Sequence, residues 1–328
     1  MKVSTARLTV SIFVVIGLLG FQNACDSAEQ KVAPASAVSS DRPLERFEFD
    51  SGAQLEQLIN ELNYTPETWQ AGIREVPRLY ITNIPPRWRD KTSKELDVLT
   101  KKRVFFRLLG PLVLHSNELI QADRDRVLLI IKALQGGDAV SSEDQTFLRE
   151  TAAAYKVVEG DTDFADRLLQ DKLLRRVDTL PPSLVLAQAA EESGWGTSRF
   201  AAAGNALFGM WTWDGKGVKP SQQRSELGNY KIASYETPLE SVVAYMHNLN
   251  THQAYKGLRA RRAELRKTGK KVTGWELANT LTKYSERGQA YVDSLHSLMN
   301  VNKLKPTDDA YLGDGPTILL IPVGEGAN

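Results

Sequence analysis

Two adjacent glutamates, Glu191 and Glu192, follow an uncharged run of small and apolar residues, 184–190, that has the composition of a buried helix. A carboxyl group in a partly apolar setting has a raised pKa and can donate a proton at neutral pH, as the cleavage of a glycosidic bond requires. An acid at the end of a helix gains nothing from the helix dipole, and desolvating it is costly. The mismatch with the dipole points toward a chemical role, but at this level a solvated helix end explains the pattern as well, and helical spacing alone does not choose between the two glutamates.

The residues around this pair carry a family resemblance. The run 182–196, which ends in Glu192-Ser193-Gly194-Trp195-Gly196, is followed by Leu207-Phe208-Gly209, and the segments 208–213, 249–255 and 284–291 add to the pattern. Together they resemble the glucosaminidase domain of glycoside hydrolase family seventy-three, and in particular the Bax protein group of Gram-negative bacteria, over about residues 95–300. The resemblance implies a mainly α, lysozyme-like α+β domain with a small β lobe. It also implies an endo-beta-N-acetylglucosaminidase that hydrolyses peptidoglycan between N-acetylglucosamine and N-acetylmuramic acid.

The same resemblance assigns the catalytic residues. The general acid of the family is the glutamate directly before Ser-Gly-Trp-Gly, which is Glu192 here, and Tyr284 matches a tyrosine kept near that acid. A second carboxylate lies on the β lobe in this family, and Glu226 falls in the matching stretch, with Glu236 as the alternative. This chain departs from the pattern at Glu191, where most relatives have an apolar residue. Glu191 either faces solvent or points inward and raises the pKa of Glu192 by like-charge repulsion.

Substrate binding is expected from aromatic side chains, because flat rings stack on the apolar faces of sugars. The candidates are Trp195, Phe208, Trp211 and Trp213, although core packing explains Phe208 and Trp195 equally well. Asn205 is a further candidate. In the family an asparagine directly precedes Leu-Phe-Gly, and Ala206 occupies that position here. Asn205 stands one position earlier, so its side chain would face the other way on an extended segment. The cleft wall opposite Glu192 is expected to come from residues 207–235.

The elements that position these residues can be predicted from spacing and capping signals. Apolar periodicity predicts a short helix over 53–62 and, from residue 93 onward, a nearly continuous series of helices. These cover 95–122 with Gly110-Pro111 as the place for a kink, 124–134, 142–158, 164–177 and 181–193. Capping boxes at 142–145, 237–240 and 273–276 mark further helix starts and account for Glu240 and Glu276. Glycines and alternating residues between 207 and 235 predict the small β lobe, with a strand at 230–235.

The chain ends are organised differently. Residues 1–25, with Lys2, Arg7 and an apolar run over 8–21, have the pattern of a secretory signal. Cys25 follows this run at once and is the single cysteine, so either lipidation at Cys25 or simple cleavage nearby is expected. Residues 26–43 are expected to form a flexible tether, 44–94 an irregular N-terminal extension, 95–303 the glucosaminidase domain and 304–328 a C-terminal tail. The tail has one apolar patch, 317–323, which either adds a strand or docks.

Composition limits the partners. The 41 Lys and Arg nearly balance the 40 Asp and Glu, so no basic excess draws the chain to nucleic acid. The basic stretch 256–271 is expected to be a solvated helix face. The four histidines lack ligand spacing, so neither a metal nor a cofactor is expected. The predicted partner is the peptidoglycan glycan strand, met in the periplasm, with membrane anchoring through a lipidated Cys25 as a further expectation. The sequence does not indicate an oligomeric state. A lytic transglycosylase of the same fold and a non-catalytic wall-binding protein remain as alternatives.

Overall fold

A computed structural model describes residues 42–158, 163–213, 215–223 and 228–325. The predicted signal segment, Cys25, nearly all of the predicted tether and Glu226 lie outside these ranges. Within them the chain is mainly helical with a small β lobe, as the sequence predicted. A second small sheet contains two strands from residues 44–94, so the prediction of an irregular extension there is wrong. None of the helices in the described ranges is both long and apolar enough to cross a membrane.

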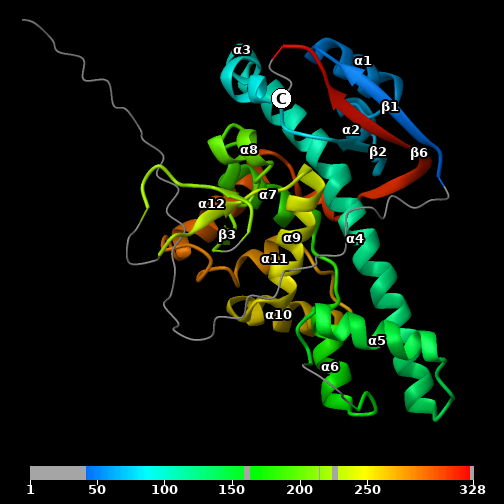
Figure 1. Ribbon diagram of the computed structural model, residues 1–328. Coiled ribbons are helices and arrows are strands. Elements are labelled where there is room, and N and C mark those ends of the chain that lie inside the picture. The colour runs from blue at the N-terminus through cyan, green and yellow to red at the C-terminus, as the bar shows by residue number, and fades with distance from the viewer. Residues whose placement is uncertain (1–41, 159–162, 214, 224–227, 326–328) are drawn as a thin grey trace, which may run out of the picture.

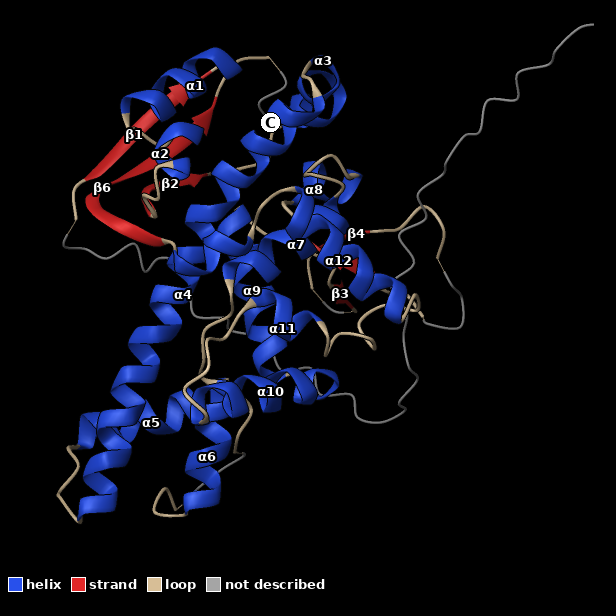
Figure 2. Ribbon diagram, turned by 180° about the vertical axis from the view of Figure 1, so that it is seen from behind, coloured by secondary structure: helices blue, strands red, loops and turns tan. Residues whose placement is uncertain are grey.

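The long helix α4, Val98–Gly136, forms the diagonal rod of the molecule in Figures 1 and 2. Asp97 caps its start by accepting hydrogen bonds from the amides of Leu99 and Thr100, and Gly137 ends it in the left-handed conformation at φ 76°. The predicted break near residue 123 is wrong. No glycine or proline stands there to end the helix, and Pro111 is accommodated within it.

The shorter helices pack around and beyond this rod (Figure 2). They begin at or within one or two residues of the predicted starts in most cases, but the cap of α5 is Ser141 rather than the predicted Ser142. Two short helical segments also occur at Trp69 and Trp88, within the extension that was expected to be irregular. The helices are α1 Gly52–Glu61, α2 Pro66–Gln70, η1 Trp88–Thr92, α3 Ser93–Glu95, α5 Ser142–Ala154, α6 Arg167–Arg176, α7 Pro182–Ser193, α8 Arg199–Gly204, α9 Pro238–Thr251, η3 Gln253–Tyr255, α10 Lys256–Lys267, α11 Gly274–Ala278, α12 Gln289–Val301 and η4 Lys305–Asp309.

One sheet joins the two ends of the described chain. Strand β6, Tyr311–Pro322, lies between β1, Leu44–Phe49, and β2, Glu75–Ile81, and is parallel to both. The sheet covers one end of α4 (Figure 1), and Arg78 of β2 binds Glu118 of α4 through two hydrogen bonds of 2.7 Å. The predicted tail therefore adds a strand, and it builds one layer with the predicted N-terminal extension.

The second sheet is the β lobe. Strand β5, Lys231–Ala233, pairs antiparallel with β3, Trp211–Thr212, on one side and with β4, Gly217–Val218, on the other. It lies beside α8 and α12, away from the first sheet (Figure 1). The strand predicted at 230–235 is thus present in its central residues, and the lobe sits where it was expected, within the helical domain.

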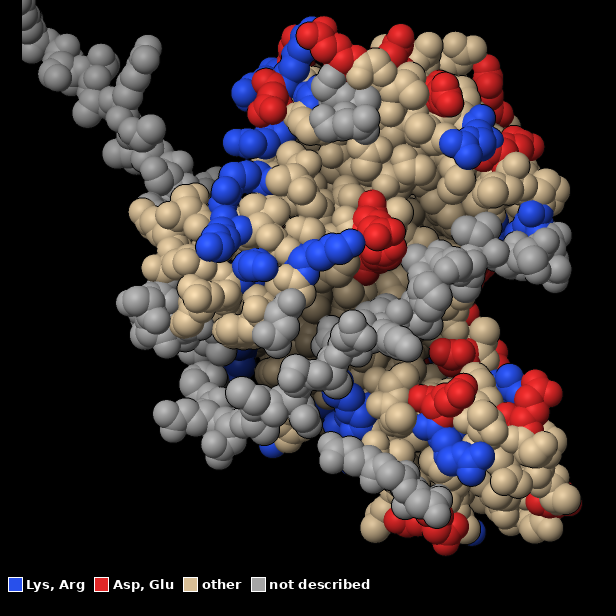
Figure 3. Space-filling model, in the orientation of Figure 1, with Lys and Arg blue, Asp and Glu red and all other residues tan. Residues whose placement is uncertain are grey.

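Two apolar cores hold these layers together. The larger core joins the sheet, α4, α7, α9, α11 and α12, and the smaller core joins the far end of α4 with α5 and α6. Figure 3 shows both signs of charge mixed over the lower helical arm and a line of Lys and Arg down the left of the upper part, past α3 and α8. The mixture agrees with the net charge of +1.

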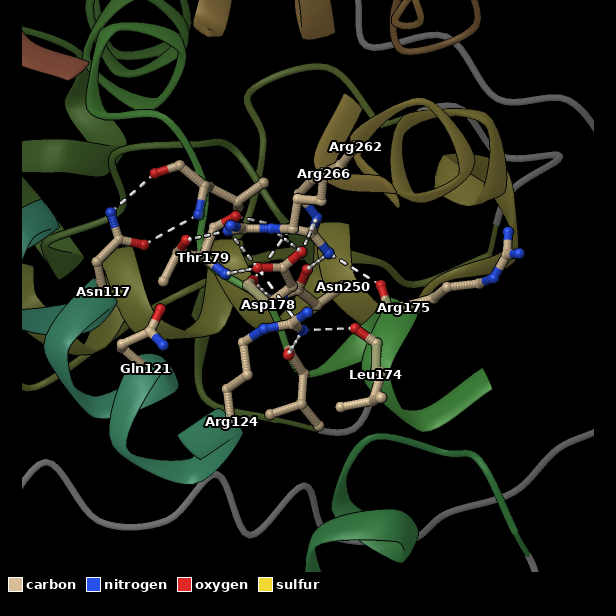
Figure 4. A network of polar contacts seen from close by, with 12 residues as sticks. Asn117, Gln121, Arg124, Leu174, Arg175, Asp178, Thr179, Asn250, Arg262 and Arg266 are labelled. Atoms are coloured by element: carbon tan, nitrogen blue, oxygen red, sulfur yellow. Dashed lines mark hydrogen bonds and ion pairs between the residues drawn. The ribbon is translucent and has the colours of Figure 1, made fainter. Parts of the chain in front are cut away.

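The basic stretch beginning at Lys256 is only partly solvated, which corrects the prediction for it. Arg262 of α10 is fully buried and Arg259 is 5% exposed. The carboxylate of Asp178, 2% exposed, forms ion pairs with Arg262 at 3.2 Å and Arg266 at 2.6 Å and lies 3.7 Å from Arg124 (Figure 4). This cluster ties α4 and α10 to the loop after α6, so the arginines serve the fold rather than a surface.

Candidate active site

Helix α7 carries the two glutamates and is almost completely enclosed. Its residues from Pro182 to Ala190 are all buried, and alanines on it let neighbouring helices approach closely. At its start the carboxylate of Asp308 accepts hydrogen bonds from the amide and the hydroxyl of Ser183, each 2.9 Å. Because α7 is fixed at its start and along its length, the position of Glu192 near its end is rigid.

The end of α7 is a tight left-handed turn. Gly194, Trp195 and Gly196 all have positive φ angles, of 56°, 64° and 74°. The Ser193 hydroxyl donates to the carbonyl of Ala189 at 2.6 Å and accepts from the amide of Gly196 at 2.8 Å. The Ser-Gly-Trp-Gly motif thus stops the helix directly after Glu192, since left-handed backbone favours glycine.

The Glu192 side chain is half-buried and keeps some contact with solvent. The pKa of Glu192 is raised to about 7, mainly by burial. The nearby charge of Glu191 also raises this pKa, whereas a hydrogen bond from Tyr291 and the charge of Arg287 lower it. A carboxyl group with this pKa is substantially protonated at neutral pH. It can therefore donate a proton, which is the requirement for a general acid.

A chain of hydrogen bonds leads to the carboxyl group of Glu192. The hydroxyl of Tyr291, on α12, donates to Glu192 Oε1 at 2.9 Å, and Tyr291 in turn accepts a hydrogen bond of 3.0 Å from Gln188 Nε2. Gln188 accepts from the hydroxyl of Tyr245 on α9. Gln188 and Tyr245 are almost completely inaccessible to solvent, so the chain holds one oxygen of Glu192 in a fixed place.

Tyr284 completes this aromatic group. Its ring stacks on Tyr291 with a centroid distance of 5.1 Å and an interplanar angle of 12°, and Tyr255 lies 5.9 Å away on its other side. Burial raises the pKa of Tyr284 and of Tyr291 well above the ordinary value, so both phenols remain protonated. Tyr284 therefore packs on Tyr291, whose hydroxyl donates to the acid, and its supporting role in the reaction stays a prediction.

Glu191 is neither freely solvated nor pointed at the acid. Its carboxylate accepts a hydrogen bond of 2.5 Å from Arg287 and one of 3.0 Å from the hydroxyl of Ser294. The side chain is 23% exposed and that of Arg287 is 50% exposed. Glu191 thus forms an ion pair beside the site, and the two partners shift the pKa of Glu192 in opposite directions.

The four predicted sugar-stacking rings lie in different surroundings. Phe208 is buried and stacks on Tyr245 at 3.8 Å, and Trp195 packs edge-on against Phe106 of α4 at 5.2 Å, so both serve the core. Trp211 is half-buried and stacks on Tyr230 at 4.3 Å, whereas Trp213 is 52% exposed. Of the four, only Trp213 presents most of its ring to solvent, on the β lobe.

The amide of Asn205 is used within the protein. Its oxygen accepts from the amide of Ile84 at 2.9 Å, and its nitrogen donates to the carbonyls of Tyr235 and Glu236 at 3.2 and 2.9 Å. Asn205 also ends α8 in the left-handed conformation, with φ 51°. A substrate contact by Asn205 would require these bonds to break, so the observed role is to tie the β lobe to the loop after β2.

The position of a second carboxylate is only partly described. Glu226 lies outside the described residues, and its alternative, Glu236, has an 80% exposed side chain that lies 3.8 Å from Lys216. Glu240 accepts from the amide of Glu236 at 3.0 Å, one residue before the N-cap Thr237, so it contributes to the start of α9 without closing the predicted capping box. Within the described ranges no cluster of three or more acidic, histidine or cysteine side chains is placed to bind a metal.

The sequence reasoning missed Gln188 and gave Tyr291 no role. Gln188 had a readable signal, since it is a polar residue within the apolar run of α7 and stands four positions before Glu192, on the same helix face. Tyr291 had none, because its contact with Glu192 joins α7 and α12 across 99 positions of the chain.

Comparisons with known proteins give the family of this chain. Residues 170–304, which contain α7 to α12, match the family described as "Glucosaminidase: Mannosyl-glycoprotein endo-beta-N-acetylglucosaminidase". The chain is 36% identical over 205 residues to "Protein bax" of Escherichia coli strain K12, an alignment that covers 62% of this chain and 70% of that protein. Among solved structures it matches the catalytic domain of the autolysin Auto from Listeria monocytogenes, with 23% identity, a TM-score of 0.32, and coverage of 52% of this chain and 99% of that one.

Proposed function

This chain belongs to the glucosaminidase family, and from that membership we propose that it is a peptidoglycan hydrolase with Glu192 as its general acid. The reaction is hydrolysis between N-acetylglucosamine and N-acetylmuramic acid, which leaves N-acetylglucosamine at the new reducing end. Glu192 protonates the glycosidic oxygen as the bond to the anomeric carbon breaks, and water supplies the new hydroxyl group.

One observation carries this proposal. The Glu192 carboxyl group lies at the end of a rigid buried helix, keeps access to solvent, and has its pKa raised to about 7. A carboxyl group that is merely structural would gain an ion-pair partner, as Glu191 does with Arg287. Glu192 instead accepts a single hydrogen bond from a neutral phenol, which supports a role as proton donor.

Mass spectrometry of digested peptidoglycan tests the reaction. The proposal expects fragments that end in a reducible N-acetylglucosamine, each carrying the mass of one added water. Fragments that end in 1,6-anhydro-N-acetylmuramic acid would identify a lytic transglycosylase instead. Binding to peptidoglycan without formation of new glycan ends would identify a non-catalytic wall-binding protein.

The transglycosylase alternative has one specific observation in its favour. Such an enzyme needs no carboxylate to activate water, and the described candidate for that role, Glu236, is 80% exposed on its side chain and lies near Lys216. Participation of the substrate's own acetamido group would remove the same need in a hydrolase. The nature of the fragment ends decides between these reactions.

We further propose that the protein acts in the periplasm, exported by residues 1–25 and anchored through Cys25. The support is the sequence pattern alone, a positive start, an apolar run and a cysteine placed directly after it. Replacing Cys25 with serine tests the anchor. Lipidation predicts that this variant moves from the membrane fraction to the soluble periplasmic fraction, and an unchanged distribution would exclude it.

A further inference from the structure

An apolar cavity whose lining does not include Glu192 lies between α1, the loop after β2 and the first half of α4. Its volume is about 420 Å³, within the range of sites that bind small molecules. The wall is mainly aliphatic and aromatic. Its apolar lining includes Leu55, Ile59, Ile84, Val104, Leu108 and Leu112. The cavity is partly open to solvent, so this apolar wall stays in contact with water unless something fills the space.

The rim of the cavity carries a guanidinium group without a partner. Arg107 lines the cavity and is half-buried, and its contact within the described chain is the face of the Tyr64 ring, 5.7 Å away. Neither a hydrogen bond nor an ion pair links its guanidinium to another described residue. Burial lowers the pKa of Arg107, and the charge of Arg103 acts in the same direction, whereas Tyr64, Glu56 and Glu67 act against them.

The other charged residues of the rim do not neutralise Arg107. Arg103 stands one turn earlier on α4 and donates only to Thr100, at 3.1 Å. Arg87 donates to the carbonyls of Val323 and Phe49. The carboxylates of Glu56 and Glu67 act on Arg107 from a distance, but both residues are exposed, so water screens them, and neither forms an ion pair with Arg107 among the described residues. The cavity therefore combines an apolar wall with guanidinium groups that have no carboxylate partner among the described residues. It complements a molecule with an apolar chain and an anionic head.

We propose that this cavity binds a single fatty acyl chain whose anionic head group pairs with Arg107. The acyl chain would displace no ordered structure, because the apolar wall already encloses the space, and the head would supply the missing partner of the guanidinium. The cavity also includes Gly196, next to Trp195 in the turn that ends α7, and Trp88, which donates to the Trp195 carbonyl at 3.0 Å. The proposed ligand site is therefore adjacent to the turn that ends α7, the helix that carries Glu192.

Calorimetric titration of the full chain with dodecanoate and with dodecan-1-ol tests this site. The two probes share the apolar chain and differ in the charge of the head. We expect one dodecanoate to bind per chain, Arg107→Met to weaken that binding by about tenfold, and the affinity for dodecan-1-ol to change less than about twofold. Lys101→Met, on the same helix but outside the cavity lining, is the matched control and is expected to bind like the wild type.

A bulky residue inside the cavity tests its location. Leu108→Trp is expected to abolish binding of both probes by filling the space, and Val104→Phe does the same from the neighbouring turn if Leu108→Trp fails to fold. Absence of binding by the wild type overturns the proposal. So does binding that survives the filling variants, or an equal loss for both probes in Arg107→Met.

A second experiment, with phosphatidylglycerol vesicles, identifies the source of the acyl chain. If the wild type sediments with the vesicles and Leu108→Trp does not, the acyl chain belongs to a membrane lipid. If the protein binds dodecanoate but not the vesicles, the ligand is a free fatty acid. The proposed wall hydrolysis is measured separately on peptidoglycan, and neither result depends on the other. Failure of one proposal is therefore distinguishable from failure of the other.

Discussion

At the scale of single residues, the site depends on opposing influences on one carboxyl group. Burial and Glu191 favour the protonated form of Glu192, while the Tyr291 hydroxyl and Arg287 favour the ionised form. The balance leaves the pKa at about 7, where the group exchanges its proton near neutral pH. Each neighbour therefore has a predictable effect on the pH dependence of the reaction.

Tyr291→Phe removes the hydroxyl that donates to Glu192 and so removes a stabiliser of the carboxylate. The pKa of Glu192 is expected to rise, and the alkaline limb of the kcat/KM profile to move upward by up to about one pH unit. Because Oε1 also loses its fixed position, kcat is expected to fall by roughly tenfold. Tyr235→Phe, which alters a phenol bonded to Met210, is the control. A limb that moves downward would contradict the assignment.

The raised pKa of Glu192 also has a consequence for stability. In the unfolded chain the ordinary pKa is 4.5, so the folded state binds more protons between pH 4.5 and about 7 and loses stability as the pH rises through that window. Glu192→Gln removes this loss. Its melting temperature is expected to exceed that of the wild type at pH 8 and to match it at pH 4, as calorimetry can measure. Equal melting temperatures at pH 8 would contradict the burial of an ionisable acid.

The sequence could indicate which residue does the chemistry but not how it is held. The motif singled out Glu192, and the acidic pair at the end of an apolar helix made a chemical role favourable. The bond from Tyr291 and the ion pair of Glu191 with Arg287 arise because α7 meets α12 and the preceding loop, and these contacts have no local signal. The interpretation of Asn205 as a substrate contact had the same weakness, since its hydrogen-bond partners lie far along the chain.

At the scale of elements, Asp308 organises the helix that carries the acid. Its carboxylate accepts from Ser183 at the start of α7 and, through Oδ2, from the amide of Gly274 at 3.0 Å at the start of α11. The two helices approach so closely there that a Cβ on Gly274 would lie 2.2 Å from the Ser183 hydroxyl. One side chain therefore caps two packed helices.

Asp308→Ala leaves the first turns of α7 and α11 without this acceptor. We expect a loss of about 2 kcal/mol or more in the free energy of unfolding, since each lost cap costs roughly 0.5–2 kcal/mol. Denaturation with urea, followed by circular dichroism, measures it. Asp309→Ala, which loses only a surface contact with Lys271, is the matched control. An effect no larger than that of the control would contradict the capping role.

Element limits were predictable where the local signals were strong. Pro182 and Gly194 bound α7, and Thr237 and Thr273 cap α9 and α11, as their sequence patterns indicated. The single helix α4 was misread as two segments because its amphipathic pattern weakens near residue 123. Residues on both sides of position 123 pack into the two apolar cores, and this packing stabilises α4 as one continuous helix.

At the scale of the whole molecule, the chain ends build one layer on α4. Strand β6 is the middle strand of its sheet. Strands β1 and β2 each pair with β6 and do not pair with each other. The sequence could not predict this pairing, because β1 and β6 are separated by the whole of the helical domain. The extension was expected to be irregular, and the tail was expected to add a strand or to dock, with no indication of its partner.

Ending the chain after Ala310 removes β6 and leaves β1 and β2 unpaired. We expect residues 44–94 to become sensitive to trypsin at Arg46, Arg74 and Arg78, while the peptides of α7 and α9 remain protected. A chain that ends after Glu325, which keeps β6, is the control. Mass spectrometry of limited digests reads the cleavage sites. Continued protection of Arg78 in the shorter chain would show that the layer does not depend on β6.

The most direct test of the account compares wild-type protein and Glu192→Gln on purified peptidoglycan. Glutamine keeps the shape of the side chain and cannot donate the proton, so release of fragments with N-acetylglucosamine ends is expected to fall by at least about a hundredfold. Sedimentation with the wall and the circular dichroism spectrum are expected to stay unchanged. Release of the same fragments at the wild-type rate by a folded Glu192→Gln protein would contradict the account.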